Sequence, residues 1–166
     1  ASPAPAAGNG KLILDATTIS IGATGKIEMD GKGYEGGKAA KHYDGGSFAG
    51  PGTSVEDING NGGGGAGSAV HATYAGGGSY GTLGANAPYR FAGSLYGESD
   101  FATELYLGAG GGCGHSCSSV GGNGGGAIKL TTTNFSIASG GVLSAKGSNA
   151  GGAWGGSGSG GTIVLN

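Results

Sequence analysis

An internal repeat constrains this chain more than any other feature. Residues 10–37 (GKLILDATTISIGATGKIEMDGKGYEGG) align without a gap with residues 126–153 (GAIKLTTTNFSIASGGVLSAKGSNAGGA), at an offset of 116 residues. A partial third copy occupies residues 161–166 at the end of the sequence. Self-similarity of this kind is typical of chains whose copies stack on one another.

Apolar residues alternate in short bursts within each copy. In the first copy the bursts are Leu12/Leu14, Ile19/Ile21 and Ile27/Met29, and the partial copy repeats the first burst at Ile163/Leu165. Alternation at a period of two predicts short strands with one buried face. Thr, Asn, Ser and Gly separate the bursts and predict turns. Because three short strands bury little alone, we expect the copies to stack as coils of a β-solenoid. An antiparallel β-sandwich is the alternative fold.

Glycine dominates the stretch between the copies, residues 38–125. The chain contains 45 glycines, and without side chains such segments are ordered mainly by backbone hydrogen bonds. Runs of three or more glycines favour an extended, polyglycine-II-like form in which neighbouring runs approach closely. We therefore predict an all-β chain with one domain at residues 10–166, a long glycine-rich excursion at 38–125, and a Pro/Ala linker or tail at 1–9.

The second copy carries a resemblance to a known class of repeats. Glycines followed by Ala-Ile-Lys-Leu130, Phe-Ser-Ile137 and Gly-Val-Leu-Ser-Ala-Lys-Gly147 resemble the glycine-rich repeats of large secreted and cell-surface proteins. That resemblance implies a right-handed β-helix, an extracellular scaffold or adhesive role, and no catalytic residues. A weaker similarity is to phage tail-tip adhesins built from glycine-rich helices, from which the Leu/Ile bursts depart.

Charge excludes several classes of partner. The net charge is −2 and only 11% of residues are charged, so no basic surface for nucleic acid is expected. No apolar run is long enough to cross a bilayer, so we expect no membrane insertion. The start at Ala1 fits a mature secreted protein or an excised module, and we expect a secreted, extracellular or cell-surface location.

The two cysteines lie close together, in Cys113-Gly-His-Ser-Cys117. In an oxidising compartment this spacing predicts a local disulfide between Cys113 and Cys117. Metal ligation by these cysteines and His115 is the alternative, but the spacing does not match a structural zinc site.

Calcium is the one cofactor that a motif suggests. Asp57, Asn59 and Asn61, with Gly62 next, match the first half of a calcium-binding loop. The twelfth position, where a bidentate Glu belongs, is Ser68, so an Asn-Gly turn explains the motif as well.

Two further features suggest contacts with carbohydrate. Asn134-Phe-Ser136 is an N-glycosylation sequon, and strand alternation turns Asn134 outward while Phe135 packs inward. Tyr96 and Trp154 offer aromatic faces for a bound glycan, although aromatic residues also fill the space that glycine leaves.

We expect a structural or assembly module that forms a fibre, coat or adhesive surface, and no enzyme. The apolar positions Leu12, Leu14, Ile163 and Leu165 would form open edges that join copies of the chain head to tail, or further coils of a larger protein. A glycan-binding adhesin is the alternative. A polysaccharide-degrading β-helix enzyme ranks last, because Asp15 and Glu28 are replaced by Thr131 and Ser144 in the second copy, so no acidic ladder forms.

Overall fold

The computed structural model describes residues 10–37, 74–87, 91–97, 105–114 and 118–166. These residues form short strands and no helix, so the all-β part of the prediction is confirmed for them. The predicted tail at 1–9 and residues 38–73 of the excursion lie outside the described residues. The strands are β1 (Lys11–Asp15), β2 (Thr18–Ile21), β3 (Lys26–Glu28), β4 (Ala127–Thr131), β5 (Asn134–Ile137), β6 (Val142–Ser144) and β7 (Thr162–Leu165).

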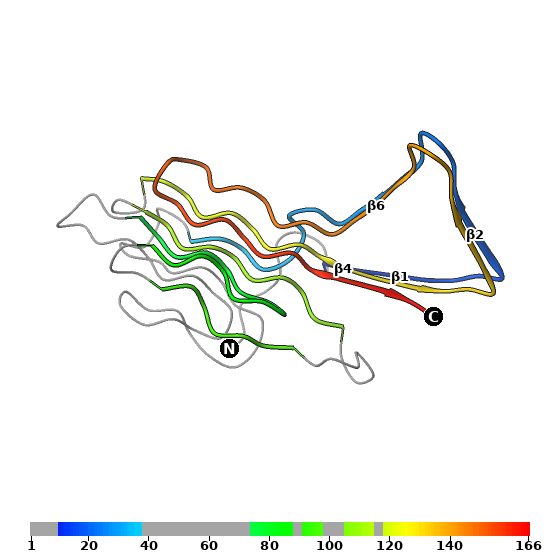
Figure 1. The fold of residues 1–166 in the computed structure, drawn as a ribbon, viewed down its shortest axis with the longest axis horizontal. Helices are drawn as coiled ribbons and strands as arrows, with labels where there is room; N and C mark the ends of the chain where they lie inside the picture. The colour runs from blue at the N-terminus through cyan, green and yellow to red at the C-terminus, as the bar shows by residue number, and fades with distance from the viewer. Residues whose placement is uncertain (1–9, 38–73, 88–90, 98–104, 115–117) are drawn as a thin grey trace.

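The strands form three parallel sheets, with the orders β1-β4-β7, β2-β5 and β3-β6. The chain therefore passes once through each sheet (β1, β2, β3), passes through each again (β4, β5, β6), and returns to the first sheet as β7. Figure 1 shows the sheets as sides of a triangle in which paired strands nearly superpose. We call residues 10–37 coil 1 and residues 126–153 coil 2. Every pair among the named strands is parallel.

The pairing register follows the offset of the sequence repeat. Leu12 lies opposite Ile128, and Leu14 lies opposite Leu130. The other two sheets keep the same offset, since β2 pairs with β5 and β3 with β6 from first residue to last. On the far side of β4, Ile163 and Leu165 of β7 occupy the places that Leu12 and Leu14 occupy on the near side.

The core lies inside the triangle and is centred on β4. Ile128 and Leu130 are fully buried, and Ile19 and Ala145 belong to the same cluster. Ile27, Met29, Phe135 and Leu143 are partly buried against it. Every second residue of a strand points into this core, because successive side chains of a strand point to opposite faces of a sheet.

The glycine-rich segments lie beside the triangle (Figure 1) and are joined by backbone hydrogen bonds. The N–H of Gly108 donates to the carbonyl of Gly125, and Gly111, three residues further, donates to Gly122. Segments 145–151 and 155–161 show the same spacing, with Gly158 bonded to Ser148 and Gly161 to Ala145. A spacing of three residues is the period of a polyproline-II-type helix.

Close approach of these segments requires glycine at particular positions. A Cβ atom placed on Gly124 would collide with the carbonyl oxygen of Gly108. At Gly22, in the turn after β2, a Cβ atom would meet nothing within 4 Å. Glycine is therefore a packing requirement in the segments beside the triangle and is dispensable at Gly22.

Candidate functional site

Among the strands that the structure describes, the stack has two faces at which no further strand pairs. The N-terminal face presents the outer edges of β1, β2 and β3, and the C-terminal face presents the outer edges of β7, β5 and β6. The backbone groups of an edge strand on its open side can pair with another strand, so each face is a potential docking surface.

In the sheet of β1, β4 and β7, apolar side chains that are buried on the middle strand have more exposed equivalents on the two outer strands. Ile128 and Leu130 of β4 are 0% exposed, because β1 and β7 cover them on both sides. On the C-terminal face, Ile163 and Leu165 are 40% and 51% exposed. On the N-terminal face, Leu14 is 37% exposed, and Leu12 is half-buried. The four predicted edge residues therefore lie on opposite faces of one sheet.

Ile137 of β5 extends the C-terminal face and was missed by the sequence reasoning. It is 42% exposed, whereas its partner Ile21 in coil 1 is 5% exposed. The alignment of the copies could have shown this exposure. Ile137 aligns with Ile21, but the partial third copy at 161–166 contains no residue at the equivalent position.

Strand β7 is fastened at both of its ends. The hydroxyl of Thr162, which is 3% exposed, donates to the carbonyl of Tyr106 at 2.8 Å and is also hydrogen-bonded to the hydroxyl of Tyr80. At the other end the N–H of Asn166 donates to the carbonyl of Leu130 at 2.9 Å. Thr162 therefore joins β7 to the glycine-rich segments.

A cluster of tyrosines lies at this junction. The ring of Tyr96 lies 5.1 Å from that of Tyr80 and 6.2 Å from that of Tyr106, between ring centres. The Tyr96 hydroxyl donates to the carbonyl of Leu107. Burial raises the pKa of Tyr96, and the neighbouring Tyr34 and Tyr80 raise it further. Tyr96, a predicted glycan contact, therefore uses its hydroxyl inside the protein.

Trp154, the other predicted glycan contact, is half-buried among glycine-rich segments. Its carbonyl accepts a hydrogen bond from Ala75 at 2.8 Å, and a Cβ atom on Gly114 would collide with it. Glycan binding at Tyr96 and Trp154 stays a prediction.

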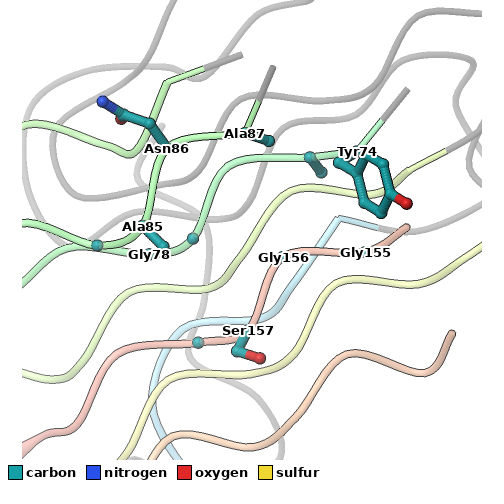
Figure 2. Close-up of a pocket in the computed structure, with 12 residues that line it drawn as sticks. Tyr74, Gly78, Ala85, Asn86, Ala87, Gly155, Gly156 and Ser157 are labelled. Atoms are coloured by element: carbon teal, nitrogen blue, oxygen red, sulfur yellow. The ribbon is translucent and has the colours of Figure 1, made fainter. Parts of the chain in front are cut away.

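A groove of about 490 Å³ lies between segments 74–78, 84–87 and 155–158 (Figure 2). Glycine and alanine form most of its lining, and Tyr74, which is 49% exposed, lies along it. Ser157 and Asn86 add polar groups. Sequence reasoning did not identify this groove, because its walls come from three separate segments with no motif in common.

The remaining predicted sites lie only partly within the residues that the structure describes. Cys113 is fully buried, but Cys117 lies outside the described residues, so the disulfide stays a prediction. The calcium residues Asp57, Asn59 and Asn61 also lie outside them. Asn134 is exposed on β5, and its glycosylation is untested.

Two features are absent from the part of the chain that the structure describes. Among the described residues no group of three or more His, Cys, Asp or Glu side chains is arranged to hold a metal ion. These residues also include no helix long and apolar enough to span a membrane.

Comparison of the chain with protein-family models, curated proteins and solved structures finds no match to any of them.

Proposed function

We propose that this chain is a β-solenoid segment whose function is structural: it joins further coils through its two open faces and so builds an extracellular fibre, coat or adhesive surface. The observation that carries the proposal is the ladder of equivalent apolar residues. Its middle members, Ile128 and Leu130, are fully buried, and its outer members, Ile163 and Leu165, are half-exposed. Covering the outer members with another coil would extend the same packing.

The topology supports a solenoid over a sandwich. One turn of chain supplies one strand to each of three parallel sheets, and the next turn pairs with it at a constant offset. An antiparallel β-sandwich would need antiparallel pairing between neighbouring strands. Handedness stays a prediction from the resemblance.

The glycine-rich part supports a scaffold role. Its hydrogen bonds recur at every third residue, which favours a polyglycine-II-like bundle. Such a bundle forms a rigid lateral extension with few side chains for chemistry, so we propose no enzymatic activity.

Two kinds of partner fit the open faces: further copies of this chain, stacked head to tail, or further coils of a larger protein. The N-terminal face ends in first-strand residues, and the C-terminal face carries their equivalents. The N-terminal face of one copy therefore fits the C-terminal face of another, whereas two N-terminal or two C-terminal faces do not fit each other.

Electron microscopy and sedimentation velocity over a range of protein concentrations test the proposal. We expect concentration-dependent assembly that Leu14→Asp weakens, because it places a charge on the N-terminal face. Ile13→Asp is the matched control, since Ile13 is 63% exposed on the same strand and alternates to the outside of the triangle. Monodisperse monomers at high concentration would contradict self-assembly.

We infer glycan binding as a second candidate function, because the groove between segments 74–78, 84–87 and 155–158 combines an exposed tyrosine ring with polar groups. Glycan-array binding that Tyr74→Ala abolishes would favour it. Phe91→Ala is the control, because Phe91 is 62% exposed and does not line the groove. Glycan binding that the Tyr74→Ala variant retains would remove this candidate.

A further inference from the structure

Segment 107–112 runs through the middle of the glycine-rich part, between three other segments. Segments 33–37, 121–126 and 155–161 each form two backbone hydrogen bonds with it, three residues apart. The first of these comes shortly after strand β3, and the other two lead directly into β4 and β7. Three segments that are continuous with the strands of the triangle therefore form a slot, and segment 107–112 fills it.

The backbone hydrogen bonds do not fix where the segment lies along this slot. Gly108 and Gly111 donate their N–H groups to one neighbouring segment, at the carbonyls of Gly125 and Gly122. Because the period is three residues, a shift by three residues would bring an equivalent N–H or carbonyl group to each partner. Another kind of contact therefore selects the observed register.

The walls of the slot exclude side chains from the middle of the segment. A Cβ atom on Gly110 would collide with the carbonyl oxygen of Glu35, in segment 33–37. One on Gly111 would collide with the carbonyl oxygen of Gly156, in segment 155–161. At these two places the slot accepts glycine and no larger residue.

Buried side chains stand at both ends of the glycine-rich run. Leu107 is 2% exposed and Cys113 is fully buried. They lie three residues before and three residues after Gly110. A shift by three residues in one direction would bring Leu107 to the place of Gly110, and the opposite shift would bring Cys113 there. Either side chain would collide with the Glu35 carbonyl.

The place of Leu107 also suits a large side chain. A Cβ atom on Gly10 would lie 2.9 Å from Cδ1 of Leu107, so the leucine fills the space beside Gly10. The shift that moves Cys113 would bring Gly110 to this place and leave the space empty. Loss of buried apolar packing then adds to the collision.

We propose that Leu107 and Cys113 act as stops that hold segment 107–112 in one register, through the carbonyl of Glu35, and that they are the specificity-determining residues of the glycine-rich part. The length of the run between the stops, rather than its hydrogen bonds, sets the register. Because the walls continue into the strands, this register ties the glycine-rich part to the triangle. The inference goes beyond the proposed stacking of copies and does not depend on it.

Two insertions that differ by one methyl group test the stops. Insertion of Gly-Gly-Gly between Gly112 and Cys113 lengthens the run by one period. Either Leu107 or Cys113 can then keep its place with only glycine at the place of Gly110. Proton–nitrogen correlation NMR should show two sets of amide peaks for segment 107–112, one set for strands β1 and β4, and one set throughout for the unmodified chain.

The second insertion is Ala-Gly-Gly at the same position. In the shifted register its methyl group falls at the place of Gly110 and collides with the Glu35 carbonyl, whereas in the original register it falls at the place of Cys113, where a side chain fits. The second set of peaks should therefore be about tenfold weaker than with Gly-Gly-Gly. Circular dichroism of both variants verifies that the strands are retained.

A pair of substitutions decides the outcome if the lengthened chains do not fold. Gly110→Ala should release the segment from the slot, so the N–H groups of Gly108 and Gly111 should exchange with deuterium about tenfold faster or more. Ala109→Gly is the control, because it removes a methyl group from the same segment without a collision, and both N–H groups should stay protected.

Several outcomes would overturn the inference. A second set of equal intensity in both insertion variants would show that the Glu35 carbonyl does not exclude side chains. A single set in both would show that the length of the run does not set the register. Two sets in the unmodified chain, or unchanged protection in Gly110→Ala, would overturn the inference too. All these measurements use the monomer, so none of them bears on whether copies stack.

Discussion

At the scale of single residues, Asp30 joins the two coils on their outer surface. Its carboxylate accepts hydrogen bonds from the hydroxyl of Ser144 and the backbone N–H of Lys146. Burial acts to raise the pKa of Asp30, but these hydrogen bonds and the charge of Lys146 outweigh it and lower the pKa below the ordinary value of 3.8.

This lowered pKa predicts a stability that depends on pH. A carboxyl group with a lower pKa in the folded state stabilises the protein above its unfolded pKa, and the contribution is lost as pH falls through the folded pKa. We expect the urea midpoint to fall between about pH 5 and pH 2, and Asp30→Asn to flatten part of that fall. At neutral pH the substitution should cost about 1 kcal/mol, because solvent screens an exposed carboxylate. Asp15→Asn is the control; an equal effect there would contradict the assignment.

The close contact between the backbones at Gly124 and Gly108 predicts that a side chain there lowers stability. Gly124→Ala should lower the free energy of unfolding by about 1–3 kcal/mol, because its Cβ atom would collide with the Gly108 carbonyl and push two segments apart. Gly22→Ala should leave stability unchanged or raise it by up to about 1 kcal/mol, since it restricts the unfolded chain without a collision. Urea unfolding of both variants measures the difference, and equal effects would argue against tight packing at Gly124.

At the scale of elements, β4 is the strand whose two sides are both covered. Leu130→Ala should therefore cost about 2–5 kcal/mol of unfolding free energy, the usual range for a buried leucine. Leu165→Ala removes the same atoms from a side chain that is 51% exposed and should cost less than half as much. Similar losses at both positions, measured by urea unfolding of the monomer, would mean that β7 is covered in solution.

Elements whose side chains alternate between core and solvent were predictable. Leu12 and Leu14 aligned with Ile128 and Leu130 in the sequence, and the same pairs lie opposite each other in the sheet. A slip of one residue would turn these side chains outward, so burial itself specifies the register.

The pairing of glycine-rich segments was not predictable for the converse reason. Gly108 bonds to Gly125 and Gly111 to Gly122, yet nothing in their chemistry distinguishes them from neighbouring glycines. The groove lined by Tyr74 depends on this packing, and so it too escaped prediction. The sequence alone also did not show that the backbone carbonyl of Trp154 accepts a hydrogen bond from Ala75 in segment 74–78.

At the scale of the whole molecule, the difference in charge between the two coils would orient the proposed stacking of copies. Coil 1 bears four carboxylates with three lysines, and coil 2 bears two lysines alone. The affinity between copies, with coil 1 of one on coil 2 of another, should therefore fall several-fold when NaCl is raised from about 0.05 to 0.5 M. The reason is that the Debye length shortens to a few ångströms. Lys146→Gln should reduce this salt dependence in sedimentation equilibrium. Assembly with the same affinity at both salt concentrations would show that charge does not orient the copies.

The bundle of hydrogen-bonded glycine segments has a thermodynamic consequence. Folding it removes peptide groups from water with little accompanying hydrocarbon, and exposure of polar groups lowers the heat capacity of unfolding while exposure of apolar groups raises it. The heat capacity change per residue should therefore fall below the usual 12–15 cal/mol/K, an approximate range for globular proteins. A small heat capacity change flattens the curve of stability against temperature. Such a molecule should lose little stability on cooling, where proteins held together by large hydrophobic cores weaken.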